Sequence, residues 1–206
     1  MNKITSFSIK TPCFGRGAPK VTATTQSKLK KTVVLVGMMG AGKTAVGKAL
    51  AASLGVPFLD SDAEIESAAA MSIAEIFARD GEAFFRARET QVIDRLLDGE
   101  SGILSTGGGA FLSEQNRKLI SDKGVSVWLK ADLPLLWNRV KYKNTRPLLR
   151  TDNPYETLQN LYETRAPIYA MADISVQARP EYSIETMASK VRDALASRPD
   201  VLEAKP

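Results

Sequence analysis

The fold of this chain is decided by the stretch Val33-Val34-Leu35-Val36-Gly37-Met38-Met39-Gly40-Ala41-Gly42-Lys43-Thr44. Its first four residues form an apolar, β-branched run, which is typical of a buried strand in a parallel sheet. The residues from Gly37 onward fit the pattern GxxxxGK[ST], in which a loop between a strand and a helix binds phosphate. Backbone N–H groups and the helix N-terminus then face the phosphates, the lysine reaches the β- and γ-phosphates, and the Thr44 hydroxyl can ligate Mg²⁺. We therefore predict nucleotide binding by the consecutive residues Gly40, Ala41, Gly42, Lys43, Thr44 and Ala45.

A dinucleotide-binding turn is the competing interpretation of the same glycines. The segment from Gly40 to Ala45 also satisfies GxGxx(G/A), and Asp60 lies 20 residues beyond Gly40, where a ribose-binding acid belongs. However, the predicted strand ends at Val36, so the turn begins before that pattern starts. A dinucleotide-binding turn also gives the lysine and the threonine no role, and we therefore favour the phosphate-binding loop (P-loop).

Strands and helices alternate along the rest of the chain. Short apolar runs predict further strands at 57–59, 102–105, 125–129 and 174–176. Other patterns predict helices at 45–53, 61–98 and 113–122, after the N-cap candidate Asp132, from Pro154 onward and at 183–196, with a polar loop at 141–153. Ser61 with Glu64, and Ser72 with Glu75, have the spacing of capping boxes, so we expect helix starts there. The alternation predicts an α/β fold, a five-stranded parallel sheet flanked by helices on both faces.

The composition excludes several classes of protein. The chain has 206 residues, of which 44% are hydrophobic and 25% charged, as expected for one globular domain. No apolar run approaches the ~18 residues of a transmembrane helix, so we expect no membrane partner. The single cysteine, Cys13, excludes a disulfide framework and a cysteine-rich zinc site. The absence of histidine excludes catalysis and metal binding by that residue type.

Positive charge is concentrated at the N-terminus. Residues 1–31 contain seven Lys or Arg and no Asp or Glu, show no hydrophobic period, and are predicted to form a disordered basic tail. Residues 32–206 are predicted to form a single domain. They contain 21 of the 28 basic residues of the chain and all 23 acidic ones. This slightly acidic body argues against a nucleic-acid partner. The tail is either a plain bacterial-type tail, which implies a cytoplasmic protein, or a binding arm or transit peptide, and a transit peptide implies a plastid.

An acidic pair follows the second predicted strand. Ligands of open parallel sheets lie beyond the carboxyl ends of the strands, where Asp60 and Asp62 could place one carboxylate toward Mg²⁺ and the other toward an acceptor hydroxyl. The alternative is structural, because Ser61 and Glu64 match a capping box and an acid in the first helical turn is favoured by the helix dipole. The P-loop upstream leads us to favour the functional interpretation.

Four arginines are candidates for binding an anionic substrate, because the planar guanidinium matches carboxylate and phosphate groups. They are Arg86, Arg88, Arg146 and Arg165. Each alone is more often a solvated surface residue, but Arg146 lies in the polar loop, and mobile arginines over a phosphate site are common in phosphoryl transfer. The run Gly107-Gly108-Gly109 follows a strand at the same edge of the sheet as the P-loop. Its N–H groups are therefore candidates for binding a substrate carboxylate or hydroxyl.

Taken together, these segments resemble the shikimate kinase family, from about residue 31 to about residue 196. The resemblance is carried by GMMGAGKT at 37–44, FLDSD at 58–62, SIAEIFARDGEAFFRARE at 72–89, LSTGGGA at 104–110, NTRPLL at 144–149 and ETRAPIYAMAD at 163–173. It implies an enzyme of aromatic amino-acid biosynthesis that transfers the γ-phosphoryl group of ATP to the 3-hydroxyl of shikimate. It also implies the nucleoside-monophosphate-kinase fold, with a substrate-binding segment at about 61–98 and a lid at about 141–153.

The resemblance further implies roles for individual residues. Lys43 and Thr44 serve the phosphates and Mg²⁺, and Asp60 organises the metal through water. The contacts to shikimate are Asp62, Arg86, Gly108, Gly109 and Arg165. The residues with catalytic roles are Lys43, Asp62 and Arg146, the last being the lid arginine that reaches the phosphates. Arg139 matches the arginine that stacks on adenine.

Two features depart from the family pattern. The loop Gln177–Ser183 is short, which leaves open whether Arg179, Pro180 or neither contacts the base. The third strand ends in Ser105-Thr106 rather than in an acid, which agrees with a metal held by Asp60 through water.

Three alternative functions remain. A kinase of another small polyol acid, such as gluconate, would keep the P-loop but would not need Arg86, Gly108 and Arg165 together. A catalytically silent kinase-like binding module would not need an intact Lys43 and Asp62. A nucleotide-regulated protein would act through the basic tail on a membrane or RNA. We expect a monomer whose partners are shikimate and ATP.

Overall fold

The core of the protein is a parallel sheet with the P-loop strand at its centre. The computed structural model describes residues 28–142 and 147–203. The sheet has the strand order β3-β4-β2-β5-β6, and every neighbouring pair is parallel. Its strands are β2 (Thr32–Val36), β3 (Phe58–Asp60), β4 (Ile103–Ser105), β5 (Gly124–Lys130) and β6 (Ile174–Gln177). The predicted α/β fold is confirmed, and all five predicted strands lie within two residues of the observed ones.

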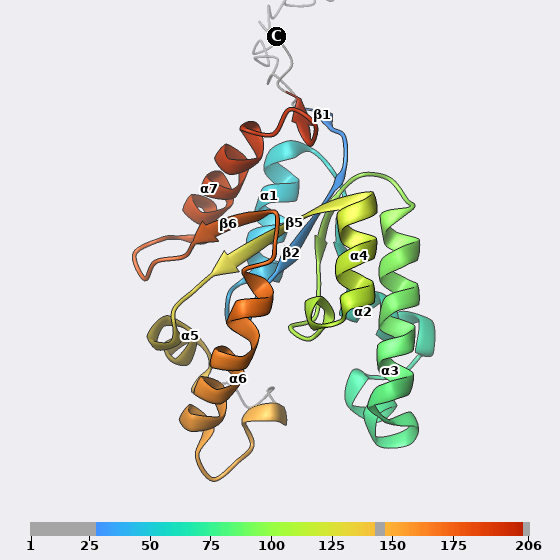
Figure 1. Cartoon of the computed structure of the whole chain (residues 1–206), viewed down its shortest axis with the longest axis vertical. Helices are drawn as coiled ribbons and strands as arrows, with labels where there is room; N and C mark the ends of the chain where they lie inside the picture. The colour runs from blue at the N-terminus through green and yellow to red at the C-terminus, as the bar shows by residue number, and fades with distance from the viewer. Residues whose placement is uncertain (1–27, 143–146, 204–206) are drawn as a thin grey trace, which may run out of the picture.

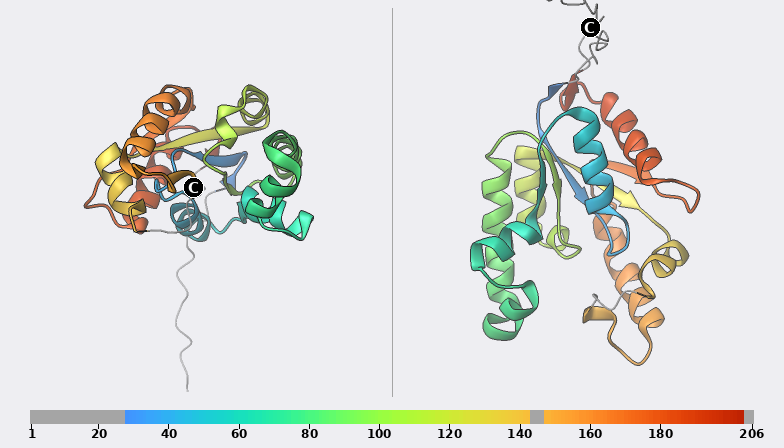
Figure 2. Two further views of the ribbon diagram at one scale, coloured as in Figure 1. Left: turned by 90° about the horizontal axis from the view of Figure 1, so that it is seen from below. Right: turned by 180° about the vertical axis from the view of Figure 1, so that it is seen from behind.

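Helices cover both faces of the sheet. They are α1 (Lys43–Leu54), α2 (Ser61–Ala69), α3 (Ile73–Leu97), α4 (Glu114–Lys123), α5 (Leu133–Val140), α6 (Pro154–Tyr169) and α7 (Ile184–Ala196). Two short 3₁₀ helices, η1 (Ala110–Leu112) and η2 (Pro147–Leu149), join them. Helices α1 and α7 pack together on one face, and α4 lies on the other face beside α3 (Figures 1 and 2). No helix of the described ranges is long and apolar enough to cross a membrane.

Two helical arms extend past the carboxyl ends of the strands (Figure 1). One consists of α2 and the first half of α3, and the other of α5, η2 and α6. The first arm bends at Gly81, whose φ of 80° and ψ of 174° interrupt α3. Because ligands of such sheets bind beyond the carboxyl ends of the strands, the two arms flank the place where a site is expected.

The N-terminal boundary of the folded domain differs from the prediction. Lys28–Leu29 form β1, which pairs antiparallel with β7 (Leu202–Glu203). The backbone N–H of Lys30 also donates to the carbonyl of Val201 at 2.8 Å, and the side chain of Leu29 is buried. The prediction that the tail extends to residue 31 is therefore wrong for 28–31, because a two-residue strand carries no hydrophobic period. Residues 1–27 of the predicted tail lie outside the described residues.

The start of α2 also differs from the prediction. The N-cap is Asp60 and not Ser61, because the Asp60 Oδ1 accepts from the backbone N–H of Asp62 at 3.1 Å and of Ala63 at 3.3 Å. Ser61 is instead the first helical residue and is fully buried. The strand β3 runs into α2 without a connecting turn, so the carboxylate at the end of the strand already faces the free N–H groups of the helix. The second predicted capping box, at Ser72, is confirmed with both of its hydrogen bonds.

Candidate active site

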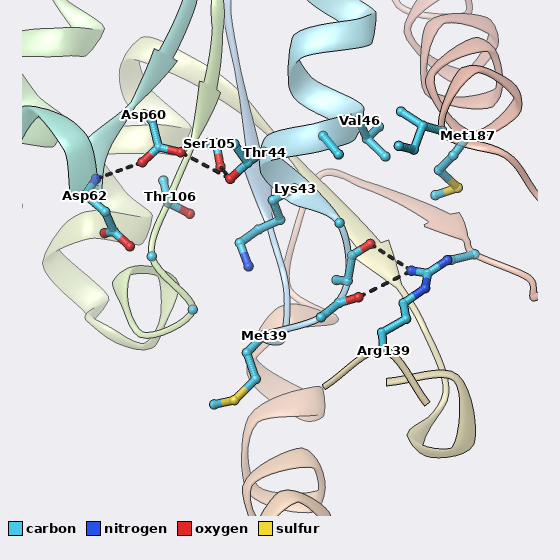
Figure 3. A pocket seen from close by; sticks show the side chains of 18 of the residues that line it. Met39, Lys43, Thr44, Val46, Asp60, Asp62, Ser105, Thr106, Arg139 and Met187 are labelled. Carbon is cyan, nitrogen blue, oxygen red and sulfur yellow. Dashed lines mark hydrogen bonds between the residues drawn. The ribbon is translucent and has the colours of Figure 1, made fainter. Parts of the chain in front are cut away.

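A cavity of about 470 Å³ opens at the carboxyl ends of the strands and is lined by the P-loop, by Asp60 and Asp62, and by Arg139 with the segment that leads into α7. The P-loop forms its floor. In Figure 3, Thr44 and Asp62 lie on one side, Arg139 and Met187 lie on the other, and the Lys43 side chain reaches into the space between them. The cavity thus joins the predicted phosphate-binding loop to the predicted acidic pair, although the two are separate in the sequence.

The P-loop has the backbone conformation that its glycines predict. Gly37, Gly40 and Gly42 have φ values of 136°, 84° and 96°, which other L-residues rarely adopt. The Lys43 ammonium lies inside the loop, where Nζ donates to the carbonyl of Gly37 at 2.8 Å and of Met38 at 3.1 Å. The side chain is nearly buried, so its charge is concentrated at the place where the phosphates of a nucleotide are expected.

Three side-chain oxygens meet next to the P-loop. The Thr44 Oγ1 donates to Asp60 Oδ2 at 3.2 Å and can accept from the Oγ of Ser105, which lies 3.3 Å away (Figure 3). Among the described residues, no group of three or more His, Cys, Asp or Glu forms a protein-only metal cluster. Mg²⁺ prefers oxygen ligands and is commonly held by one or two carboxylates together with substrate phosphates and water. The oxygen set therefore fits Mg²⁺, with Ser105 at the place where the sequence lacks an acid.

Asp62 lies against the glycine run that follows β4. A Cβ placed on Gly107 would lie only 2.7 Å from Asp62 Oδ1, so a side chain at this position would displace the carboxylate. The same Oδ1 is buried and has no hydrogen-bond partner in the described part of the chain. Burial and the neighbouring charge of Asp60 raise the pKa of the Asp62 carboxyl above its ordinary range. An unpaired buried oxygen is costly, and here it marks a place for a hydrogen-bond donor such as a substrate hydroxyl.

The Arg86 guanidinium lies over the other end of the same glycine run. A Cβ on Gly109 would lie 2.6 Å from both Nη atoms of Arg86. The Arg86 Nη1 donates to Glu89 Oε2 at 2.9 Å, while Nε and Nη2 donate to the exposed Glu82 at 3.3 and 3.2 Å. One edge of the guanidinium is therefore anchored by a buried carboxylate, and the other edge has only an exposed partner that an anionic substrate can replace.

Glu89 is a residue of the site that the sequence analysis missed. It is only 1% exposed, and its Oε1 has no hydrogen-bond partner among the described residues. Burial raises the pKa of its carboxyl, and the Arg86 guanidinium opposes this rise. The available signal was its position three residues after Arg86, which places the two side chains on one face of a helix.

Arg165 and Tyr169 approach the glycine run from α6. The Tyr169 hydroxyl donates to the carbonyl of Gly108. Burial raises the pKa of this hydroxyl to about 12, and the charge and hydrogen bond of Arg165 oppose the rise. The charge of Arg86 acts on the same hydroxyl, so both arginines lie near the glycine turn.

One of the predicted arginines is not brought to this place. Arg88 is exposed, donates to the side chain of Gln91 at 2.7 Å, and lies 4.9 Å from the ring centre of Phe84 on the outside of α3. Arg146 lies outside the described residues, together with most of the loop between α5 and η2.

The far side of the cavity is built for a less polar group. Arg139 Nη1 donates to the carbonyls of Gly40 and Ala41, both at 3.3 Å, and burial lowers the pKa of its guanidinium. Facing it from the segment after β6 are Ala178, Tyr182, Ser183, Ile184 and Met187. Arg179 and Pro180 are not among the described residues that line the cavity. Instead, Arg179 is exposed, with its Nη1 3.8 Å from Glu181.

Comparison with known proteins relates the chain to a family. A family model described as shikimate kinase matches residues 39–196. Shikimate kinase of Ruegeria pomeroyi is 69% identical over 175 residues, which are 85% of this chain and 90% of that protein. Shikimate kinase of Cereibacter sphaeroides is 66% identical over 177 residues, 86% of this chain and 88% of that protein.

Solved structures agree with this result. The structure of shikimate kinase from Acinetobacter baumannii in complex with shikimate has a TM-score of 0.77 and 38% identity, and covers 81% of this chain and 93% of its own. A gluconokinase from Sinorhizobium meliloti has a TM-score of 0.53 and 21% identity, covers 82% of this chain and 97% of its own, and shows only a common fold. The chain, with its P-loop, acidic pair and arginine-flanked glycine turn, belongs to the shikimate kinase family.

Proposed function

We propose that the protein transfers the γ-phosphoryl group of ATP to the 3-hydroxyl of shikimate, and that the residues around the cavity divide this task between a donor side and an acceptor side. The observation that carries the proposal is the glycine turn at 107–109. It is flanked by an unpaired carboxylate oxygen of Asp62 and by the guanidinium of Arg86. A molecule with both a hydroxyl and a carboxylate is the partner that such a turn complements.

On the donor side, the P-loop and Lys43 bind the phosphates of ATP. The buried ammonium stabilises the charge that develops on the transferred group, which is the main protein contribution to phosphoryl transfer. Thr44, Asp60 and Ser105 would hold Mg²⁺, directly or through water, and this ion would neutralise charge on the β- and γ-phosphates when it is bound. Gly40, Ala41, Gly42 and Ala45 contribute backbone groups around the same phosphates.

The base of ATP is assigned to the far side of the cavity. Arg139 covers one side of this region, and Tyr182, just before α7, and Met187, within it, line the region from the other side. The planar guanidinium is suited to stack on a flat aromatic ring. This assignment gives no role to Arg179 or Pro180.

On the acceptor side, Arg86 and Arg165 bind the carboxylate of shikimate, aided by the N–H groups of Gly108 and Gly109. Neither of these N–H groups donates to another backbone group in the described part of the chain. Glu89 holds Arg86 in place through its buried carboxylate. The acceptor is thereby fixed at one end, which reduces the entropy lost in the reaction step.

Asp62 orients the 3-hydroxyl and takes its proton. Its buried oxygen accepts a hydrogen bond from the hydroxyl, and its raised pKa makes the carboxylate a better proton acceptor than an exposed aspartate. In a loose transition state this transfer is needed only late, so the first contribution of Asp62 is orientation.

The remaining assignments concern the arms and the assembly. We assign shikimate binding to about 61–98, and a lid that excludes water to about 141–153, with Arg146 reaching the phosphates when it closes. We assign the whole activity to one domain and to a monomer. The relatives are bacterial, which supports a cytoplasmic enzyme rather than a plastid one.

The test is a coupled assay that follows ADP release with ATP, Mg²⁺ and a panel of polyol acids including shikimate and gluconate. Turnover with shikimate, lost in the Lys43→Ala variant, is the expected result. Preferential turnover of gluconate would identify a kinase of another polyol acid, and ATP binding without turnover of any acceptor would identify a binding module.

A further inference from the structure

The hydroxyl of Tyr169 connects the helix that carries Arg165 to the glycine turn of the acceptor side. We infer that Tyr169 is a positioning residue for the acceptor, which holds the peptide between Gly108 and Gly109 so that the Gly109 N–H faces the substrate carboxylate. This inference rests on the proposed function, because it concerns the same carboxylate. Tyr169 itself is 1% exposed and is not expected to touch the substrate.

The geometry of the peptide bond explains how a remote hydroxyl can orient an N–H group. The carbonyl of Gly108 and the N–H of Gly109 belong to one planar unit and point in opposite directions. When Tyr169 donates to this carbonyl, the N–H is held on the opposite side of the turn, away from Tyr169. Three successive glycines have no side chains to restrict them. The Gly107 N–H donates to Ser61 Oγ and the Ala110 N–H to the Gly107 carbonyl, and Tyr169 holds the peptide between Gly108 and Gly109.

Tyr169 is itself held against the donor side of the site. Its ring stacks on that of Trp128, with centroids 6.2 Å apart and planes 30° apart. Trp128 in turn packs on the P-loop, because a Cβ on Gly37 would lie 3.2 Å from its Cδ1. A chain of packed groups therefore runs from the P-loop through two buried aromatic rings to the acceptor turn. It sets the position of the turn relative to the phosphates.

The same hydroxyl also interacts with an arginine assigned to the carboxylate. Arg165 lies four residues before Tyr169 on α6, which places the two side chains on one face of the helix, and the positive charge of Arg165 lowers the pKa of the Tyr169 hydroxyl. With a pKa raised to about 12 by burial, the hydroxyl stays protonated at the pH of any enzyme assay. It therefore remains a donor to Gly108, and its oxygen lone pairs stay available to a donor such as Arg165.

The test is the Tyr169→Phe variant, which removes the hydroxyl and keeps the ring and its packing on Trp128. The loss of one orienting hydrogen bond is expected to raise the KM for shikimate about three- to tenfold. The KM for ATP, and the slow hydrolysis of ATP by water without shikimate, are expected to change less than about twofold, because the P-loop contacts are intact. Tyr162→Phe is the matched control: it removes a hydroxyl from the same helix, and that hydroxyl makes no hydrogen bond within the described ranges.

Three results would overturn the inference. The first is an unchanged KM for shikimate in Tyr169→Phe. The second is an equal rise in the KM for shikimate and the KM for ATP. The third is a fall in melting temperature of more than about 10 °C. The second and the third result would each reveal a purely structural residue. The failure of the proposed function is distinguishable from all three, because the unmodified enzyme would then not phosphorylate shikimate at all.

Discussion

Replacing Gly109 by alanine tests whether Arg86 binds the carboxylate of the acceptor. The new Cβ would lie 2.6 Å from both Nη atoms of Arg86 and 2.9 Å from Cζ, whereas ordinary contacts begin at 3.4 Å. The guanidinium must therefore move by about 0.8 Å, because packed atoms do not interpenetrate. The backbone of Gly109 has φ −91° and ψ −17°, which alanine adopts without strain. The effect thus comes from the displaced arginine and not from a distorted turn.

The size of the effect follows from the shift and from the bond that it breaks. A misplacement of about 1 Å at a binding group can cost about 10²-fold, and a hydrogen bond to a charged group contributes about 1.5–3 kcal/mol. We expect the KM for shikimate to rise about 10- to 100-fold, while kcat changes less than about threefold and the KM for ATP stays the same.

The assay is steady-state ADP release with shikimate varied at saturating ATP. Gly99→Ala is the control, because its Cβ would meet only the backbone carbonyl oxygens of Leu96 and Arg95, at 3.5 and 4.0 Å. An unchanged KM for shikimate in a folded Gly109→Ala enzyme would refute the assignment of Arg86 to the acceptor carboxylate.

Three further predictions concern the P-loop, the acidic pair and the N-terminus. Lys43→Ala is expected to lower kcat/KM by at least about 10³-fold, or about 4 kcal/mol of transition-state stabilisation, with an unchanged circular dichroism spectrum; near-normal turnover would contradict its role. Asp62→Asn is expected to lower kcat/KM for shikimate by about 10²-fold. The pKa of Asp62 is raised, so activity falls as pH drops through a value above 3.8, and this acid limb should be absent in the variant. The same raised pKa means that the folded state binds the proton more tightly than the unfolded state, so stability is lost as pH rises through it; Asp62→Asn should therefore melt at a higher temperature at pH 7, and a lower melting temperature would contradict the burial. Deleting residues 1–27 is expected to change kcat/KM less than about twofold, whereas deleting through residue 31 also removes the buried Leu29 and should cost about 2 kcal/mol of unfolding free energy in urea titration.

The sheet and most of its helices could be predicted from local patterns. Short apolar runs, the P-loop, the caps at Ser72 and Asp132 and the helix start at Pro154 are signals that lie within a few residues of the elements they define. The pairing of β1 with β7 could not be predicted, because each strand has only two residues. Each strand is stabilised by a partner from the other end of the folded domain.

The acceptor side of the site likewise contains some residues that could be predicted from the sequence and others that could not. Asp62 and Arg86 stand out by charge and motif, but Glu89 and Tyr169 are ordinary members of helical patterns. Their roles arise only when α3 and α6 meet the glycine turn, where the buried carboxylate holds Arg86 and the buried hydroxyl holds Gly108. The residues that line the base region, such as Tyr182, likewise depend on how the short segment after β6 folds back over the cavity.

The measurement that tests the proposed function most directly is identification of the product. Shikimate and gluconate at equal concentration are incubated with ATP, Mg²⁺ and the enzyme, and the phosphorylated species are resolved by mass spectrometry and by ³¹P–¹H correlation NMR. We predict that phosphate accumulates on shikimate, at its 3-hydroxyl, and that gluconate stays unmodified. Phosphate on gluconate, on another hydroxyl of shikimate, or on neither acid while ATP is consumed would contradict the assignment of this cavity.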